Sequence, residues 1–490
     1  MKSSTGTAAV ETESTMGATR LAQNPSGGAV SRPAVPVRRG RPVPASLRWL
    51  AVAFLVSLSF DALPWADVFG EGDTLSSMVG LLLAVAFVIS GRLRLSEVSG
   101  SSWQWFVLLA AVSAATELGR WLSLPSMEAE RSLRVYFTTV QIFAMFVIFR
   151  SLAIDPKVRV ALFRGFVVTS GALALLGSVG LGGESRALAG GRASILDRNE
   201  NELAVSFGLA AVCLVWWLLS SPRLSRAWRV VAGVVAASLL LGTIQTGSRG
   251  GALATGTAIL IVVFLSFRLR KAALYFAVVP IIAWAGSVAL SSESILARRF
   301  VAAIEGTDRG TRPELVEAGL RVASRSPWIG VGPAHDVLLG QELGFSRISA
   351  HNTWLQVGLS FGVIGLAVFA VFIGQTARRL WRRRFEPEGV LAMAAVSMLL
   401  VKFFVAHTMN NKMTWIVLAI AGAVGARAGA PRVASRGAAL HRRRDARFPE
   451  AFPTLGSPGS ARTSRREETA GGAGRRSPGR GLIPTERPTS

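Results

Sequence analysis

Apolar runs long enough to cross a lipid bilayer recur along most of this chain, and they constrain its fold more than any other feature. A membrane-spanning helix needs about 17 to 25 predominantly apolar residues, and half of the 490 residues are hydrophobic. We therefore predict an all-α, polytopic integral membrane protein with about 12 transmembrane helices. The predicted spans are 46–63, 74–90, 103–118, 133–149, 159–180, 203–220, 228–245, 250–267, 272–290, 353–374, 388–406 and 413–427.

The formal charge of +25 is concentrated at the two ends of the chain. Residues 1–48 carry a net charge of +5 and residues 427–490 a net charge of +9, so the two segments hold +14 together. Both are rich in Gly, Pro, Ser and Arg, a composition typical of disorder. We expect disordered basic cytoplasmic tails at 1–45 and 429–490, which lie against membrane lipids and bind no nucleic acid.

The short loops between the predicted spans alternate in charge. Loops rich in Lys and Arg fall on the same side as both tails, and cytoplasmic loops are the ones that carry an excess of these residues. The first loop on the other side, 61–73, has four acidic residues and no basic one. We therefore predict a multi-pass protein with both termini cytoplasmic and the long loop 291–350 facing outward.

Arginine is concentrated in this long outward loop. The pattern Thr311 to Glu314 resembles a capping box, which predicts a helix from about residue 312 to 326. We expect that helix to dock on the membrane domain through its apolar side chains and to hold several cations in place. The arginines of the loop are Arg298, Arg299, Arg309, Arg312, Arg321, Arg325 and Arg347, and the apolar side chains of the helix are Leu315, Val316, Leu320 and Val322.

Two further residues suggest chemistry at the outer interface. Arg249 is flanked by small residues where a helix begins, and the N–H groups of a helix N-terminus favour an anion. Guanidinium groups bind phosphate oxygens bidentately and keep their charge, so converging arginines suit a lipid-linked diphosphate without a metal. His351, where the chain re-enters the membrane, suits a base that accepts a proton from an incoming hydroxyl.

Three motifs together resemble the O-antigen ligase and polymerase superfamily. They are Thr246–Gly251, the Arg312-Pro-Glu-Leu start of a helix with Pro327–Gly332 after it, and His351-Asn352 placed nine residues before Gly362-Val-Ile-Gly365. The resemblance implies an O-antigen ligase-like membrane domain at 46–428, located in a bacterial inner membrane. It implies a glycosyltransferase that moves a glycan from an undecaprenyl-diphosphate donor to an acceptor hydroxyl, with no cofactor.

The resemblance also implies roles for particular residues. Arg249 and Arg312 are expected to bind the diphosphate, and His351 is expected to act as the base or to position the acceptor. The expected substrate-binding residues are Arg321, Asn352, Arg198 and Asn201, and Asn352 either orients His351 or caps its helix. No cluster of His, Cys, Asp or Glu has metal-ligand spacing.

Several alternatives stay open at this point. The acceptor is a lipopolysaccharide, a growing exopolysaccharide or a protein, because ligases and polymerases share these motifs. A transporter of an anionic solute would use the same arginines as a transient site, and a non-catalytic component of a polysaccharide assembly complex would not need them. The acidic loop 61–73 offers a rival site, in which a carboxylate acts as base or holds a metal.

Overall fold

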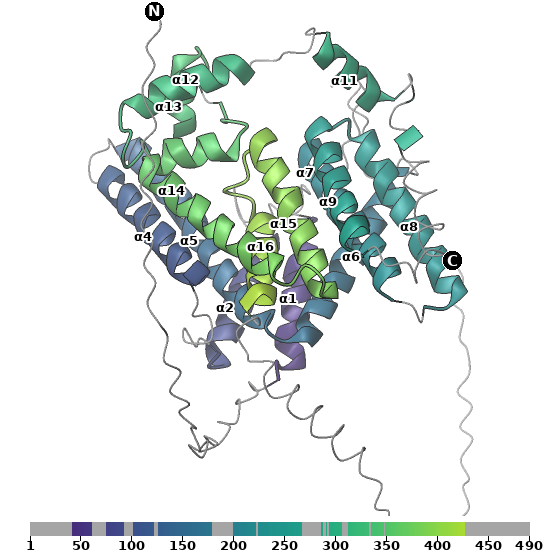
Figure 1. Ribbon diagram of the computed structural model, residues 1–490. Coiled ribbons are helices and arrows are strands. Elements are labelled where there is room, and N and C mark those ends of the chain that lie inside the picture. The colour runs from purple at the N-terminus through teal and green to yellow at the C-terminus, as the bar shows by residue number, and fades with distance from the viewer. Residues whose placement is uncertain are drawn as a thin grey trace, which may run out of the picture. The chain divides into compact units, whose positions relative to one another are not determined.

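The computed structural model of this chain describes most of its predicted membrane domain (Figure 1). The chain divides into the units Met1–Gly429 and Ala430–Ser490, and every described residue belongs to the first. The predicted tails lie outside the described residues, apart from residues 42–45. The described ranges are 42–60, 75–92, 101–121, 126–178, 199–221, 224–266, 286–287, 291, 294–305, 312–332, 335–346 and 348–426.

Helices joined by turns make up these ranges, and no strand occurs within them. The predicted all-α class is therefore confirmed. The helices are α1 (Ala45–Ser57), α2 (Leu75–Ile89), α4 (Ser101–Trp121), α5 (Ser126–Leu152), α6 (Pro156–Ser178), α7 (Glu200–Ser220), α8 (Arg226–Gln245), α9 (Arg249–Ser266), α11 (Ile295–Ile304), α12 (Arg312–Ser324), α13 (His335–Glu342), α14 (Thr353–Trp381), α15 (Pro387–Val405) and α16 (Lys412–Ala426).

Six of the helices that the structure describes, α6, α7, α8, α9, α14 and α15, are long and apolar enough to cross a membrane. Shorter apolar helices lie at or within α1, α2, α4, α5 and α16. Each predicted span except 272–290 coincides with one of these helices. Because nearly all of 272–290 falls outside the described ranges, the total of about 12 spans stays a prediction.

Aromatic side chains join helices that are far apart in the sequence. Phe106 of α4, which is 1% exposed, lies 3.9 Å from Phe146 of α5 between ring centroids. It also contacts Phe372 of α14 at 5.8 Å and Trp415 of α16 at 5.7 Å. Such ring contacts add to the free energy gained from burying the side chains. They hold α14, which carries the His351 motif at its N-terminus, against α4, α5 and α16.

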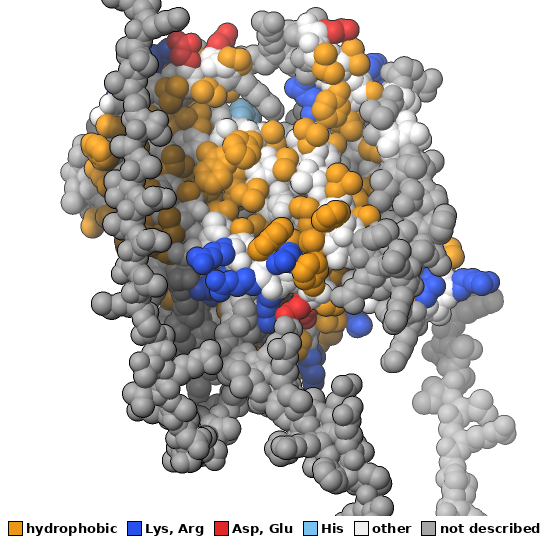
Figure 2. Space-filling model, viewed as in Figure 1, with side chains coloured by type: hydrophobic (Ala, Val, Ile, Leu, Met, Phe, Trp, Pro, Cys, Tyr) orange, Lys and Arg blue, Asp and Glu red, His pale blue; other side chains and the backbone are white. Residues whose placement is uncertain are grey.

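Apolar side chains also cover much of the outer surface of these helices. On the face drawn in Figure 2, hydrophobic side chains spread over a broad area, and Lys and Arg side chains gather at one end of it. The exposed apolar residues include Val168 of α6, Val234 of α8 and Phe264 of α9. Exposed apolar patches of this extent mark surfaces that contact lipid or other proteins. The arrangement agrees with a multi-pass membrane protein.

The basic connections lie together at one end of the helices. Arg159, at the start of α6, donates to both carboxylate oxygens of Glu388 at 2.7 and 2.8 Å. Arg383, just after α14, donates to the carbonyl of Val424 in α16 at 2.6 Å. Trp216, near the C-terminus of α7, donates to the carbonyl of Pro387 at 2.6 Å. These described parts of the basic loops therefore share one side, as the charge pattern predicts.

The other ends of the same helices meet at a second set of contacts. Asn411, before α16, donates to the carboxylate of Glu202 in the first turn of α7 at 3.1 Å. Lys412 donates to the hydroxyl of Ser76 at the start of α2 at 2.7 Å. α7 thus runs from this end, where it begins, to the basic end, where Trp216 lies. The turn before α9 and the residues before α14 belong to this same end, opposite the basic loops, because Ser248 bonds to Asn201 of α7 and Thr353 bonds to Ala406.

The loop 291–350 contains α11, α12 and α13, in agreement with the prediction of short helices there. α12 begins at Arg312 and ends at Ser324, close to the predicted bounds. It packs on α13 and α14 through Leu315, Ala318 and Val322, which are buried with Leu339. The prediction that Val316 and Leu320 dock as well is wrong, because both are exposed. Their positions fall outside the stripe at i, i+3 and i+7 that faces the domain.

A break in α14 joins two of the sequence motifs into one structural unit. Gly362 has φ 63° and ψ −165°, so the helix is interrupted there. The segment 327–332 fills the interruption. Val331 donates to the carbonyl of Leu359 at 2.7 Å, and Val363 donates to the carbonyl of Pro327 at 2.8 Å. Two more bonds, from Gly332 to Ser360 and from Ile364 to Trp328, complete the exchange at 3.2 Å each.

The break explains why glycines occur at these positions. A Cβ on Gly362 would lie 2.3 Å from the carbonyl carbon of Trp328, and one on Gly330 would lie 2.5 Å from the amide nitrogen of Phe361. Both glycines also have positive φ, at 63° and 77°, a conformation that other residues rarely adopt. An interrupted membrane helix needs partners for its released backbone groups. The loop supplies them and is thereby fastened to α14.

Candidate active site

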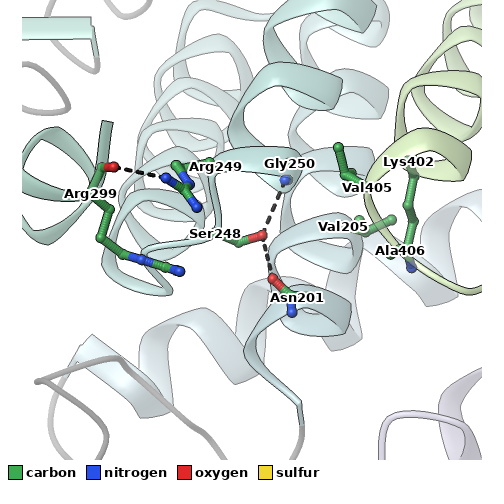
Figure 3. Close-up of a pocket in the computed structure, with 10 residues that line it drawn as sticks. Asn201, Val205, Ser248, Arg249, Gly250, Arg299, Lys402, Val405 and Ala406 are labelled. Carbon is green, nitrogen blue, oxygen red and sulfur yellow. Dashed lines mark hydrogen bonds between the residues drawn. The ribbon is translucent and has the colours of Figure 1, made fainter. Parts of the chain in front are cut away.

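A polar pocket of about 60 Å³ lies where the N-terminal ends of α7 and α9 meet the C-terminal end of α15 (Figure 3). This volume is large enough for several water molecules. Four segments that are distant in the sequence contribute side chains to it. The lining residues are Asn201, Val205, Ser248, Arg249, Gly250, Gly251, Arg299, Lys402, Val405 and Ala406, and none of these is acidic.

Two arginines fasten α11 to the turn before α9. Arg249 Nη1 donates to the carbonyl of Arg299 at 2.9 Å, and Arg299 Nη1 donates to the carbonyl of Gly247 at 2.9 Å. Each bond uses one of the five N–H donors of a guanidinium group. The two like charges are thus held beside one pocket by backbone carbonyls. A pair of fixed cations in a partly buried site favours an anionic ligand.

Ser248 connects this turn to the start of α7. Its hydroxyl donates to Asn201 Oδ1 at 2.8 Å and accepts from the backbone N–H of Gly251 at 3.2 Å (Figure 3). Ser248 is buried, with 2% of its surface exposed. Asn199 caps α7 by accepting from the N–H of Asn201 at 2.9 Å, which sets the direction of the helix. The structure therefore places two of the predicted site residues, Asn201 and Arg249, in one pocket.

Lys402 is a lining residue that the sequence analysis missed. It lies in the last turn of α15 and is only 5% exposed. In Figure 3 its side chain descends from α15 across the pocket from Arg249 and Arg299. A signal was present in the sequence, because an ionisable residue inside an apolar span is by default a candidate functional residue. Arg299 was noted among the loop arginines, but no motif distinguished it from the others.

His351 has an unusual backbone conformation. Its φ is 48°, and no other non-glycine residue of the described ranges has positive φ. The side chain is exposed, and its ring lies edge-on to that of His407 with centroids 5.7 Å apart. Residues held in sparsely populated backbone regions cluster at functional sites. The next residue, Asn352, caps α14 by accepting from the N–H of Leu355 at 3.0 Å, so the capping alternative is confirmed.

Hydrogen bonds connect the His351 turn to the pocket wall. The hydroxyl of Thr353 donates to the carbonyl of Ala406 at 2.7 Å, and Asn352 Nδ2 donates to the carbonyl of Phe404 at 3.4 Å. Ala406 lines the pocket, and Lys402 lies one turn before it. The start of α14 is therefore fixed to the segment that also forms the wall opposite Arg249. His351 and the pocket lie at the same end of the domain.

The remaining predicted residues have different positions. Arg312 is the first residue of α12, as expected, but its side chain lies outside what the structure describes, as does Arg198. Arg321 forms ion pairs with Glu317 at 2.8 Å and with Glu342 at 3.4 Å. These contacts link α12 to α13. They give Arg321 a structural role, and its predicted role in substrate binding stays a prediction.

Residues with metal-ligand chemistry are not grouped in the described part of the chain. No set of three or more His, Cys, Asp or Glu side chains lies close enough there to hold a metal ion. His335, which is buried, contacts the hydroxyl of Ser360 at 3.1 Å through Nδ1. The rival acidic site at 61–73 lies outside the described ranges.

Comparison with known proteins identifies the segment that holds these features. Residues 234–370 match the model of a family described as O-antigen ligase, and a search of curated proteins finds no match. The matched segment contains Arg249, Arg299, the loop helices and His351, and it ends just after the break in α14. The resemblance inferred from the motifs is therefore confirmed, and residues 234–370 are the part of this membrane protein that is similar to O-antigen ligases.

Proposed function

We propose that this protein is a membrane glycosyltransferase of the O-antigen ligase or polymerase type, which moves a glycan from an undecaprenyl-diphosphate donor to an acceptor hydroxyl. One observation carries the proposal. Arg249 and Arg299 line a pocket whose described lining has no acidic residue, and His351 lies at the same end of the domain. These three residues belong to the segment that matches the O-antigen ligase family.

The donor diphosphate is bound by Arg249 together with Arg299. Their guanidinium groups bind phosphate oxygens through charge-assisted hydrogen bonds and keep their charge at any physiological pH. Arg312, at the start of α12, adds a third guanidinium when the donor is bound. Arg198 and Arg321 are further candidates for donor contacts. Fixed positive groups stabilise a phosphate leaving group without a metal ion, because they need no reorganisation during the reaction.

The transfer itself is a displacement at the anomeric carbon of the donor sugar. The acceptor oxygen forms a bond to that carbon while the bond from carbon to the diphosphate oxygen breaks, and the diphosphate keeps the electron pair. His351 accepts the proton of the acceptor hydroxyl. Its exposed ring leaves room for an acceptor to approach. Asn352, which caps α14, fixes the position of this histidine.

The charge distribution supports one orientation in the membrane. We propose that the basic end, with Arg159 and Arg383, faces the cytoplasm of a bacterial cell and that both termini lie on that side. The pocket and His351 then face outward, at the outer surface of the inner membrane. A lipid-linked donor reaches such a site from the outer leaflet, with its diphosphate at the level of the headgroups.

Reconstitution into vesicles tests the proposal. The purified protein is supplied with an undecaprenyl-diphosphate oligosaccharide as donor. Three acceptors are tested in separate reactions: a lipopolysaccharide core, a second donor glycan and a protein. We expect transfer to one of them, unchanged by a chelator. The variants Arg249→Ala and His351→Ala should each lose about 100-fold or more of the rate. The control Arg384→Ala removes an exposed cation at the basic end and should keep the wild-type rate.

Three outcomes would contradict the proposal. Transfer that a chelator abolishes would replace the metal-free mechanism and would direct attention to the acidic loop 61–73. Uptake of an anionic solute into the vesicles without any transfer would identify a transporter. Full polysaccharide production in cells that carry both the Arg249 and His351 variants would identify a non-catalytic component of an assembly complex.

A further inference from the structure

Lys402 is a buried cation that the proposed mechanism does not use. It lies in α15 among apolar residues and is 5% exposed, next to Val405 and Ala406 of the same pocket. Placing a charged side chain inside a membrane span is costly, and such residues face a polar cavity and serve a function. The pocket that Lys402 lines also contains Arg249 and Arg299. Its position is therefore the first sign of a role in binding an anion.

The number of cations exceeds what the donor needs before it reacts. Three cationic side chains line the pocket, and the other polar side chains in the described lining, Asn201 and Ser248, are neutral. A diphosphate that joins a sugar to a lipid carries two negative charges. When the bond to the sugar breaks, the departing oxygen gains a third. Interactions that strengthen along this path lower the barrier, whereas those equal in both states only tighten binding.

The geometry of the pocket separates Lys402 from the two arginines. Arg249 and Arg299 are attached to the backbone of the α9 turn and of α11, whereas Lys402 comes from α15 on the other wall. The carbonyl of Ala406, four residues after Lys402, accepts a hydrogen bond from Thr353 at 2.7 Å. Through this bond the Lys402 wall is continuous with the His351 turn. Of the three cations, Lys402 is thus the one on the segment fastened to the proposed base.

We propose that Lys402 contacts the phosphate attached to the donor sugar and stabilises the charge that develops on its departing oxygen. This inference rests on the proposed function and adds a catalytic residue to it. In the reaction the bond from the anomeric carbon to this phosphate oxygen breaks and the oxygen keeps the electron pair, next to the Lys402 ammonium. The acceptor oxygen bonds to the carbon, and its proton goes to His351. Arg249 and Arg299 hold the diphosphate throughout.

The test compares Lys402→Met with Lys402→Arg in the reconstituted protein. Methionine keeps the length and apolar stem of lysine without the charge. We expect Lys402→Met to lower kcat by about 10²- to 10³-fold and to change the KM for the donor by no more than about threefold, whereas Lys402→Arg should keep most of the rate. Lys412→Met is the matched control at the same end of the domain but outside the pocket, and it should keep the wild-type kcat.

A binding measurement separates this role from a structural one. Undecaprenyl diphosphate, which carries the product charge, should bind Lys402→Met at least about tenfold more weakly than wild type, a loss typical of a charge-assisted hydrogen bond. Undecaprenyl monophosphate should bind both proteins with similar affinity. Equal losses for the two lipids, or a wild-type kcat in Lys402→Met, would overturn the inference.

The failure of this inference differs from a failure of the proposed function. If wild type transfers glycan and Lys402→Met transfers it equally well, only the role of Lys402 is wrong. If wild type transfers nothing but binds undecaprenyl diphosphate in a Lys402-dependent manner, the pocket is a diphosphate site and the proposed reaction is wrong. A thermal melting curve of Lys402→Met accompanies both measurements, and Lys402→Gln, which also removes the charge, replaces it in both assays if the methionine variant does not fold.

Discussion

Replacing Gly362 with alanine tests whether the break in α14 is a structural requirement. An added Cβ would lie 2.3 Å from both the carbonyl carbon and the carbonyl oxygen of Trp328. Both atoms belong to backbone that is itself hydrogen-bonded across the break, so neither moves without cost. The backbone angles of Gly362, φ 63° and ψ −165°, are in addition almost restricted to glycine. Strain and steric overlap therefore act in the same direction.

The expected loss of stability follows from these two effects. A non-glycine residue in this backbone region costs about 1–3 kcal/mol. Relieving the overlap requires that the segment 327–332 separate from α14, where four backbone hydrogen bonds cross the break. Losing two of the four removes about 1–3 kcal/mol at roughly 1 kcal/mol each. We expect Gly362→Ala to lower the free energy of unfolding by about 2–6 kcal/mol in total.

The single cysteine provides the assay. Cys213 is buried in α7, so a thiol-reactive fluorogenic dye labels it only when the domain unfolds. For a domain of this size the predicted loss corresponds to a fall in Tm of about 5 °C. Gly374→Ala is the control, because it lies in the same helix and its Cβ would meet no atom within 4 Å. Equal Tm values for the two variants would refute the reasoning.

Three further predictions concern other residues. His351→Gly and His351→Ala should both lower the transfer rate by about 100-fold or more. The glycine variant should have the higher Tm, because glycine adopts φ 48° without strain, and a higher Tm for the alanine variant would contradict this. Ser248→Ala removes the hydroxyl between Asn201 and the α9 turn, so the KM for the donor should rise about 2- to 10-fold at constant kcat. An unchanged KM in steady-state assays would show that Ser248 does not hold the donor pocket in shape. Glu388→Gln removes the charge that pairs with buried Arg159. Because Glu388 is 44% exposed, melting curves should show a loss of only about 1–3 kcal/mol in the free energy of unfolding, with wild-type transfer, and an unchanged Tm would show that the pair contributes nothing.

The sequence alone predicts the architecture well because the bilayer permits few alternatives. An apolar run that spans the membrane must form a helix, and most helices of the described ranges begin and end within a few residues of the predicted spans. The exceptions include α5, which begins at Ser126 instead of 133, and α14, which ends at Trp381 instead of 374. Capping chemistry is local too, so the start of α12 at Arg312 and the Asn352 cap of α14 follow from adjacent residues. The docking face of α12 was predicted less well, because any of several apolar stripes on a short helix is able to face the domain.

The separate motifs were recognised in the sequence without their spatial relation. Pro327–Gly332 and the Gly362–Gly365 pair are one unit, in which each segment completes the backbone hydrogen bonds of the other. The sequence does not contain this information, because backbone amide and carbonyl groups are the same at every residue. Gly330 and Gly362 each combine a positive φ with an added Cβ that would overlap backbone atoms of the other segment.

The sequence by itself determined the class of protein, the resemblance of its central segment to O-antigen ligases, and Arg249 and His351 as candidates for the reaction. Only the tertiary structure decided which cations share a pocket. Arg249 lies with Arg299 and Lys402, from α11 and α15, and the described side chains do not show Arg312 there. Hydropathy patterns and helix caps depend on residues that are close together in the chain, so they can be recognised in the sequence. The meeting of side chains more than a hundred residues apart depends on how whole helices pack, and no local pattern specifies that.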